Sequence, residues 1–363
     1  MNLSNLQRLF SNYSTQSFST KNFSTESTRS SIQVCLLNAH TPLGKMTSFL
    51  LKQNPIVSKV KLQGDRKVTN LAEVLNQIDT KCRVEPYPHV KDLPKSLMGA
   101  DIVLLLSSQV WPQDTPIGKR ILGESQRVYD VIKECTLQAP KALVVVAVPP
   151  VSVFTPFVAN VFKQSHFYHP GKIVGSAAMA QITINSLVGR YHDMNPFITQ
   201  VPIIGGPDID VAVPLLSRAK PVPVPARCTN ILMSKFRQVE LESFPKIHCK
   251  ENCTEYHPIS EAYALNNMIV TLGSGILEDP KAVYNAFVRM NLVSSCQYLV
   301  SLLQFSKEGV VHNFGLPTLT NFELGMLERA ITLIKLREEI ATELVSYCEG
   351  KCKTPTMKRA GLN

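Results

Sequence analysis

The sequence predicts an α/β protein with a Rossmann-like, doubly wound parallel sheet and a second, mixed α/β domain. Short apolar runs alternate with segments of helical spacing through the first half of the chain, which is typical of consecutive βαβ units. The run KALVVVAVPP at 141–150 is rich in β-branched residues, as strands buried on both faces are. A chain of 363 residues is also long enough for about two domains.

The first predicted unit is a strand, a tight turn, a helix and a second strand. Thr41 can cap the helix, and Pro42 fits its first position, where a missing N–H group has no cost. Apolar residues then recur at helical spacing until Asn54-Pro55 ends the helix. The two strands are expected at 32–37 and 57–65.

The later elements continue the alternation, and their crossovers should be right-handed. PVPVP at 221–225 is expected to be a surface loop. Further strands are predicted at 99–108 and 141–150, and helices at 71–78, 120–135, 153–163, 177–190 and 322–349.

Residues 1–30 have the composition of a mitochondrial transit peptide. The segment is rich in Ser, Thr and Asn, carries three basic residues against Glu26 alone, and places Leu3, Leu6 and Leu9 on one helical face. A plain disordered tail is the alternative. The predicted organisation is a disordered leader (1–30), a Rossmann-like domain (31–175), a substrate-type α/β domain (176–350) and a C-terminal tail (351–363).

The charge and hydropathy of the chain argue against two classes of partner. The net charge is +10, but no run of five or more Lys and Arg residues occurs, so a specific nucleic-acid role is not favoured. No apolar run reaches the roughly 20 residues that a membrane span needs.

The nine cysteines are odd in number and irregular in spacing, which favours free thiols in a reducing compartment. HCKENCTEYH at 248–257 matches no standard zinc spacing, and His248 and Cys249 are adjacent, which makes joint ligation awkward. Cys348 and Cys352 give a still weaker signal. We therefore predict no metal site.

Several stretches jointly resemble the mitochondrial malate dehydrogenases, and they occur in the order and at the spacing of that family. The resemblance extends over nearly the whole chain after the leader. The stretches are FLLKQNPIVSKVKL (49–62), PKSLMGADIVLL (94–105), PKALVVVAVPPVS (140–152), HPGKIVG (169–175), VPIIGG (201–206) and VPLLS (213–217).

The resemblance implies a homodimer in the mitochondrial matrix that interconverts malate and oxaloacetate with NAD. In this family, a histidine held by an aspartate takes the hydroxyl proton as hydride leaves for the nicotinamide. Arginines hold the substrate carboxylates as bidentate forks. Glycines let the cofactor pyrophosphate approach a helix N-terminus, and an acidic residue holds the ribose hydroxyls.

The cofactor positions implied by the resemblance are only partly kept. The three glycine positions of the phosphate turn hold Asn38, Thr41 and Gly44. Asn38 tolerates positive φ, whereas Thr41 places a branched side chain where phosphate should come close. The ribose-binding acid falls on Gly64, with Asp65 one residue late and therefore directed to the other face of a strand.

The catalytic positions implied by the resemblance are all substituted. Lys119 and Arg120 lie near the lost arginines, but their offset alters the geometry of a fork. Trp111 and Ile117 occupy the positions of the first two arginines, and Pro149 and Ser152 occupy those of the two asparagines. Ala180 replaces the aspartate, Thr183 replaces the third arginine, and Pro207 replaces the catalytic histidine.

No other residue is placed by a motif to replace the base. His40 lies in the phosphate turn, and His169 and His312 lie in predicted loops. Asp208 follows Pro207, but a carboxylate with a pKa of about 4 is a poor base for an alcohol. Trp111 and Ile117 are available to fill a pocket that has lost its charges.

The leading hypothesis is a catalytically inactive relative of malate dehydrogenase that acts as a structural or interaction protein. It would pair with itself or with an active paralogue through helices. The alternatives are an NAD-dependent dehydrogenase with weak or altered-substrate activity, and a protein that binds nucleotide without catalysis.

Overall fold

The computed structural model describes residues 30–112, 115–165, 167–242, 257–293 and 295–351, and positions 355, 357 and 362. Residues 31–363 form one compact unit. The predicted leader before Ser30 and most of the HCKENCTEYH stretch lie outside the described residues.

One continuous sheet runs through this unit, in the order β3-β2-β1-β4-β5-β6-β9-β10-β7-β8, with β11 paired to β10. The strands from β3 to β6 are parallel, and the rest pair antiparallel. The bounds are β1 Ile32–Leu37, β2 Val57–Gln63, β3 Arg83–Tyr87, β4 Ile102–Leu106, β5 Leu143–Ala147, β6 Ile173–Ser176, β7 Ile203–Gly205, β8 Ala212–Pro214, β9 Val283–Val293, β10 Cys296–Ser306 and β11 Gly309–Asn313.

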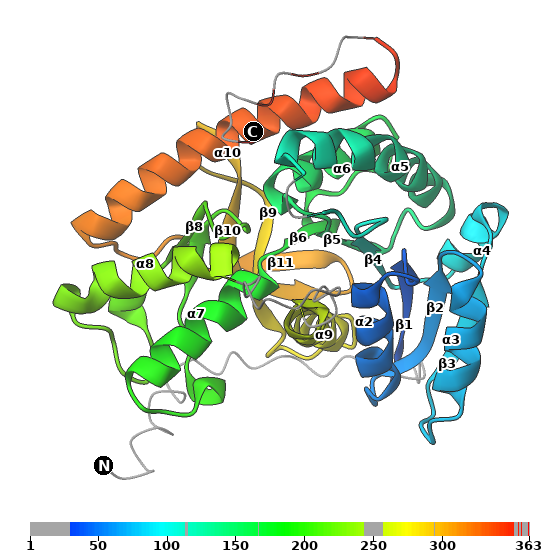
Figure 1. Cartoon of the computed structure of the whole chain (residues 1–363), viewed down its shortest axis with the longest axis horizontal. Helices are drawn as coiled ribbons and strands as arrows, with labels where there is room; N and C mark the ends of the chain where they lie inside the picture. Colours follow the sequence, from blue (N-terminus) through cyan, green and yellow to red (C-terminus); the bar gives the residue numbers. More distant parts are fainter. Residues whose placement is uncertain are drawn as a thin grey trace, which may run out of the picture. The chain divides into compact units, whose positions relative to one another are not determined.

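Helices cover both faces of the sheet, as the doubly wound prediction requires (Figure 1). Helix α10 lies beside α5 and α6 on one side, and α9 lies beside α2 and α7 on the other. The bounds are α2 Pro42–Lys52, α3 Lys67–Asn76, α4 Leu93–Leu97, α5 Ile117–Gln138, α6 Val151–Lys163, α7 Ala178–Tyr191, α8 Ala226–Glu242, α9 His257–Ile276 and α10 Asn321–Cys348, with 3₁₀ turns η1 Val90–Asp92, η2 Pro170–Lys172, η3 Pro196–Ile198 and η4 Leu216–Arg218.

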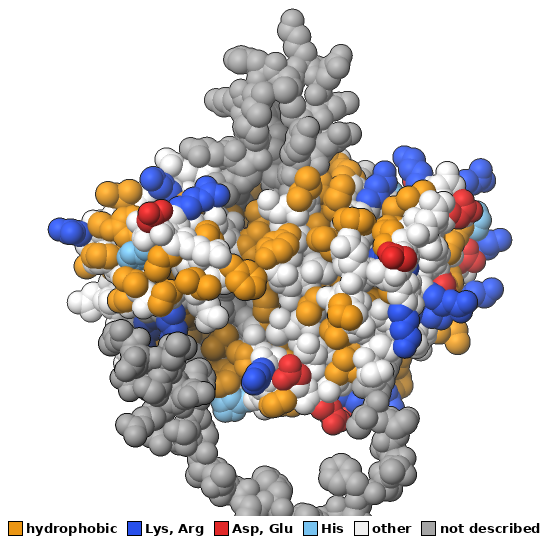
Figure 2. Space-filling model, turned by 90° about the horizontal axis from the view of Figure 1, so that it is seen from below, with side chains coloured by type: hydrophobic (Ala, Val, Ile, Leu, Met, Phe, Trp, Pro, Cys, Tyr) orange, Lys and Arg blue, Asp and Glu red, His pale blue; other side chains and the backbone are white. Residues whose placement is uncertain are grey.

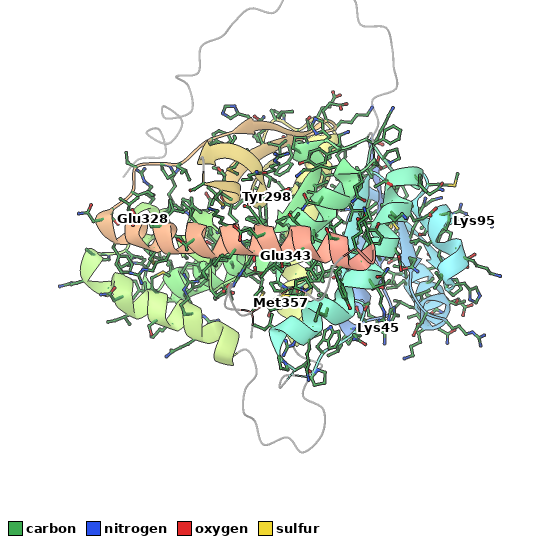
Figure 3. The ribbon with its side chains drawn as sticks, turned by 90° about the horizontal axis from the view of Figure 1, so that it is seen from above. Lys45, Lys95, Tyr298, Glu328, Glu343 and Met357 are labelled. Atoms are coloured by element: carbon green, nitrogen blue, oxygen red, sulfur yellow. The ribbon has the colours of Figure 1, made fainter. Side chains whose placement is uncertain are left out.

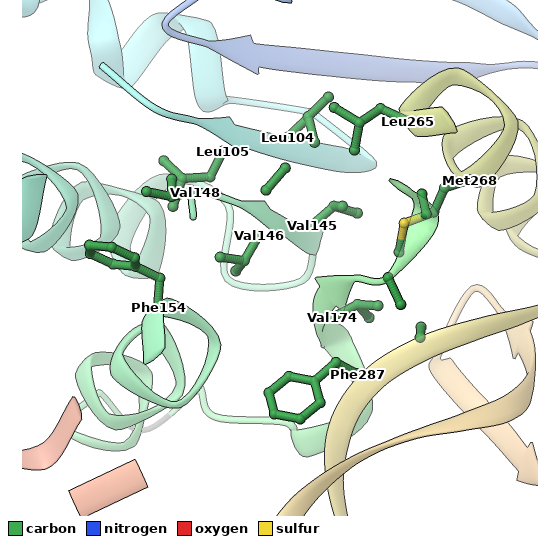
Figure 4. Packing of buried hydrophobic residues seen from close by; sticks show 14 of the residues in the cluster. Leu104, Leu105, Val145, Val146, Val148, Phe154, Val174, Leu265, Met268 and Phe287 are labelled. Carbon is green, nitrogen blue, oxygen red and sulfur yellow. The ribbon is translucent and has the colours of Figure 1, made fainter. Parts of the chain in front are cut away.

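The core lies on both faces of the central parallel strands, because alternate residues point to opposite layers. Figure 4 shows Leu104 and Val145 on the side of Leu265 from α9, whereas Val146 faces the side of Phe154 from α6. All five side chains are buried. The α/β fold class predicted from the sequence is therefore confirmed, whereas its division at residue 175 into two domains stays a prediction.

Helix α10 extends across the molecule, with Tyr298 of β10 on one side and Met357 on the other (Figure 3). Its start carries a capping box, in which Thr320 and Glu323 each accept the other's backbone N–H group. Met357 and Leu362 are buried, and both lie against Gly118 of α5. The predicted C-terminal tail thus returns to the body of the protein at these two residues.

The turn between β1 and α2 depends on one close approach. A Cβ atom at Gly44 would lie 2.6 Å from Cα of Ala39, which is backbone and cannot swing away. Helix α2 can therefore pack onto the turn only with glycine at this position.

We expect Gly44→Ala to lower the free energy of unfolding by about 1–3 kcal/mol, as forced overpacking does. Gly325→Ala on α10 is the matched control, because a Cβ there meets nothing within 4 Å. Replacing a helical glycine by alanine where the added Cβ meets nothing should raise stability by about 0.5–1 kcal/mol. Urea unfolding of both variants measures the difference, and equal effects would contradict the close-approach argument.

Several parts of the fold were not expected from the sequence, among them the helices α4, α8 and α9 and all strands after β5. β3 forms the outer edge of the parallel strands, and β9 and β10 form a long antiparallel hairpin. Helix α3 begins at Lys67 rather than at residue 71. The remaining predicted helices and strands occur within a few residues of their expected ranges.

Candidate functional site

The β1–α2 turn keeps the backbone of a phosphate-binding turn, but the side chain of Thr41 occupies a backbone N–H group that a phosphate could use. Asn38 has a φ of 62° and donates from its amide to the Leu106 carbonyl at 2.8 Å. Thr41 caps α2, since its hydroxyl accepts the Gly44 N–H at 3.2 Å and donates to the Asn38 carbonyl at 2.9 Å. The donor that a bound phosphate could use at the helix N-terminus is therefore taken by a side chain.

The end of β2 lacks an acceptor for ribose hydroxyls. A Cβ built on Gly64 would lie 2.8 Å from Nδ1 of His40, so the histidine ring fills the space where a longer side chain would stand. Asp65 is turned to α3 instead, where its carboxylate accepts the Lys67 N–H at 2.9 Å. Asp65 thus serves a helix start and not the ribose site.

NAD fits one part of this cradle and not another. The close approach at Gly44 and the positive φ of Asn38 preserve the shape that a pyrophosphate needs. The free ribose hydroxyls of NAD need an acceptor at the end of β2, and the pairing of Gly64 with His40 offers none. The residues present therefore do not fit the adenosine ribose of NAD.

The loop after β4, which holds the first predicted substrate position, is fastened to α5 by a buried carboxylate. Glu124 is 1% exposed and accepts from Ser107 Oγ at 2.7 Å, from the Ser108 N–H at 3.1 Å and from Trp111 Nε1 at 2.9 Å. The Trp111 ring also lies on Gly123, where a Cβ would come within 2.4 Å of it. The expectation that Trp111 fills an emptied pocket is not met, because its ring packs against α5.

One of the two cations singled out near this loop is also committed to structure. Arg120 donates to the Thr115 carbonyl at 2.8 Å and to the Pro112 carbonyl at 3.1 Å, so it supports the loop rather than a carboxylate substrate. Ile117 is the first residue of α5 and is 36% exposed, so it does not fill a pocket either.

The predicted aspartate and third arginine positions lie on α7. Ala180 and Thr183 are 1% and 8% exposed. The polar residue between them, Gln181, donates to the Val201 carbonyl at 2.9 Å and accepts from Asn285 at 2.6 Å. This face of α7 therefore ties the helix to β9 and to the segment before β7.

The predicted histidine position, Pro207, is buried between β7 and β8, and the residue after it forms the centre of a charged cluster. Asp208 accepts the Val151 N–H at 2.8 Å and the Ser152 N–H at 3.0 Å, and therefore caps α6. It also accepts from the Ser152 hydroxyl.

Arg337 of α10 completes this arrangement, which we call the Asp208 cluster (Ser152, Asp208, Asp210 and Arg337). The guanidinium donates to Ser152 Oγ at 2.9 Å, to Asp208 at 3.4 Å and to Asp210 through both terminal nitrogens. Arg337 is 2% exposed, so the pairing neutralises a buried charge.

The hydrogen bonds of the cluster, rather than its electrostatics, argue against proton transfer by Asp208. The pKa of Asp208 is raised above its ordinary value because burial outweighs the opposing effect of Arg337, and the nearby Asp210 adds to the rise. Each acceptor oxygen already has protein donors, which leaves the carboxylate holding a helix rather than facing a reactant.

The structure thus joins two predicted regions, Ser152 and the segment after Pro207. It directs Trp111 to α5 and Asp65 to α3. The sequence reasoning missed Arg337 and Glu124, although helical spacing carries the signal. Glu124 lies between the buried Ile121 and Val128, and Arg337 lies on the buried face of its own helix.

Neither His169 nor His312 joins this cluster, and the prediction that His312 lies in a loop is wrong, because it lies on β11. The ring of His312 on β11 packs edge-on against Phe314 at 4.7 Å, and that of His169 lies beside Gly171. In the part of the chain that the structure describes, no group of three or more His, Cys, Asp or Glu side chains could hold a metal ion. Nor is any helix there long and apolar enough to cross a membrane.

Mitochondrial malate dehydrogenases resemble this chain in sequence over most of its length. The human mitochondrial malate dehydrogenase is 27% identical over 318 residues, which cover 87% of this chain and 92% of that protein. The bovine enzyme is 26% identical over 328 residues, covering 90% and 95%. No protein-family model matches the sequence.

Solved structures show the same fold at low identity. The malate dehydrogenase of Aeropyrum pernix superimposes with a TM-score of 0.69 at 14% identity, covering 86% of this chain and all of that one. A lactate dehydrogenase from a Medee basin deep-sea metagenome library gives the same score and identity, with 86% and 99% covered. The chain is therefore a divergent homologue of the mitochondrial malate dehydrogenases and has the fold of the malate and lactate dehydrogenases.

Proposed function

We propose that this chain is a catalytically inactive member of the malate dehydrogenase lineage that serves as a structural or interaction protein in the mitochondrial matrix. One observation carries the proposal. Pro207 stands at the position that the resemblance assigns to the proton-accepting histidine, and the carboxylate beside it, Asp208, is engaged by α6, Ser152 and Arg337. Loss of a general base alone lowers the rate about 10²–10⁴-fold.

The loss of substrate binding supports the same proposal. A dicarboxylate needs bidentate cationic partners, and the buried arginine near this region is already neutralised by Asp208 and Asp210. Arg120 is held by loop carbonyls. A competing proposal is an NAD-dependent dehydrogenase with weak or altered-substrate activity. Such an enzyme would need a free base and a free cation, whereas the contacts above engage Asp208, Arg337 and Arg120.

The test is a steady-state assay of oxaloacetate reduction by the purified protein with NADH and, separately, with NADPH. We expect no rate above the protein-free control, with an active malate dehydrogenase assayed in parallel. Turnover within about tenfold of ordinary dehydrogenase values, for which kcat is about 1–10³ s⁻¹, would end the proposal.

The surface supports a role in association. Figure 2 shows hydrophobic side chains gathered over the middle of the face seen from below. Four elements that neighbour one another, α2, α7, η3 and α9, carry exposed apolar residues, and patches of this kind mark interaction sites. They are Met46 and Phe49 of α2, Tyr191 of α7, Phe197 and Ile198 of η3, and Ile259 and Tyr263 of α9.

We propose that this face pairs with a second copy of the chain or with an active paralogue. Phe49 is 43% exposed, so Phe49→Glu should leave the fold intact and convert a dimer to a monomer in light scattering. Val90→Glu is the control, because Val90 is 82% exposed on η1. A wild-type monomer would remove the homodimer, and failure to co-purify with an active malate dehydrogenase from mitochondria would remove the heterodimer.

A further inference from the structure

The adenosine end of the cradle has lost its acid and holds unpaired positive charge. Gly64 ends β2 where a carboxylate would accept the ribose hydroxyls of NAD. The His40 ring stands against it, so no side chain fits at that position without displacing the ring. The main-chain contacts of Gly64 with Tyr87 and of Ala39 with Gln63 fix the surrounding backbone.

Two cations follow Gly64 directly. Arg66 and Lys67 are exposed, and within the described residues neither side chain takes part in an ion pair or a hydrogen bond. Arg66 and Lys67 lie two and three residues after Gly64. Their Cα atoms are therefore within about 11 Å of the Gly64 Cα, because a chain extends at most about 3.6 Å per residue. Nδ1 of His40 is buried and has no hydrogen-bond partner among the described residues. This site therefore presents the positive charge of Arg66 and Lys67, next to a buried imidazole nitrogen that has no partner among the described residues.

The acid in this segment is directed elsewhere. Asp65 accepts the Lys67 N–H at 2.9 Å and so supports the start of α3. Its charge opposes an anion nearby, but the two positive charges of Arg66 and Lys67 outnumber it.

In Rossmann folds an acid at the end of the second strand favours free ribose hydroxyls, whereas an arginine nearby accommodates a 2′-phosphate. We propose that this end of the cradle takes the phosphorylated ribose of a 2′-phosphoadenosine dinucleotide, with Arg66 and Lys67 on the phosphate and His40 beside it. The phosphate is matched by charge-assisted hydrogen bonds that the diol of NAD cannot form. This inference concerns binding alone and goes beyond the proposed function, because it requires no hydride transfer.

Thr41 affects which part of the dinucleotide should contribute most to binding. Its hydroxyl already takes the Gly44 N–H, so the pyrophosphate contributes less than in an open glycine turn. Most of the binding energy should then come from the 2′-phosphate, and adenosine 2′,5′-bisphosphate should compete with the whole dinucleotide.

The test is a pair of titrations of the full chain with NADPH and NADH, without substrate, followed by calorimetry. We expect NADPH to bind at least about tenfold more tightly than NADH, because one charge-assisted contact contributes about 1.5–3 kcal/mol. Arg66→Gln should abolish the preference. Arg83→Gln removes one exposed charge from the start of β3 and should preserve it.

The outcomes separate this inference from the proposed function. Equal affinity for the two dinucleotides, or no binding of NADPH at millimolar concentration, overturns the 2′-phosphate site and leaves the inactive-homologue proposal standing. Preferential NADPH binding together with oxaloacetate reduction supports the site and ends the proposal of inactivity.

Discussion

Replacing Arg337 by methionine should lower the free energy of unfolding by about 3–5 kcal/mol, the usual cost of removing one partner from a buried ion pair. Arg337 is 2% exposed and neutralises Asp208 and Asp210. Methionine keeps the approximate length of the side chain but leaves Asp208 partly buried without its cation. The loss should be visible as a lower midpoint in urea unfolding.

Arg329→Met is the matched control, since Arg329 is exposed on the same helix. Its effect should stay within about 0.5 kcal/mol. Adding Asp208→Asn and Asp210→Asn to Arg337→Met should recover much of the loss, because replacement of a whole buried ion cluster is often nearly neutral. Equal stability of the two arginine variants would show that the cluster does not hold α6 to α10.

Glu124→Ala should release the loop after β4 and expose Trp111. The variant removes the acceptor for the Ser107 hydroxyl, the Ser108 N–H and the indole N–H. Each buried donor left without a partner costs about 1–3 kcal/mol. Trp111 is the chain's one tryptophan, so its emission should shift to longer wavelength and become more accessible to quencher.

Asp130→Ala serves as the control on the same helix, because Asp130 is exposed and accepts only from Gln126 at 3.1 Å. Its tryptophan emission should match the wild type. Should Glu124→Ala leave the emission and the quenching unchanged, the carboxylate would not be what fastens the loop.

The parallel half of the fold could be predicted because its signals are local. The apolar strand at β5, the Thr41 cap and the Asn54-Pro55 stop each act within a few residues. The β9–β10 hairpin was missed because buried polar residues such as Asn285 and Ser301 interrupt its alternation.

The candidate site could likewise be predicted only where its signals are local. A predicted substitution such as Pro207 can be read from the sequence at a single position, once the flanking stretches fix the alignment with the family. The partner of Asp208 is 129 residues away, and no local pattern encodes a pairing across that distance. A charged residue on the buried face of a helix, as at Arg337 and Glu124, is the signal that a long-range partner exists.

The homology and the chemistry of this chain thus lead to different expectations. Its relatives are named malate dehydrogenases, while residues at or beside its predicted site positions, such as Asp208 and Glu124, cap a helix or hold a loop. A protein under this arrangement keeps the core and helical surfaces of an enzyme, and the polar contacts that could serve a substrate are made within the chain.

Hydride transfer itself is the most direct test. The protein is incubated with oxaloacetate and a reduced dinucleotide, either NADH or NADPH, carrying deuterium at the transferable position, and malate is examined by mass spectrometry. We predict no deuterated malate above the protein-free control, even with protein and dinucleotide at equal concentration. Deuterated malate in an amount equal to the protein would contradict the account, whatever the rate of product release.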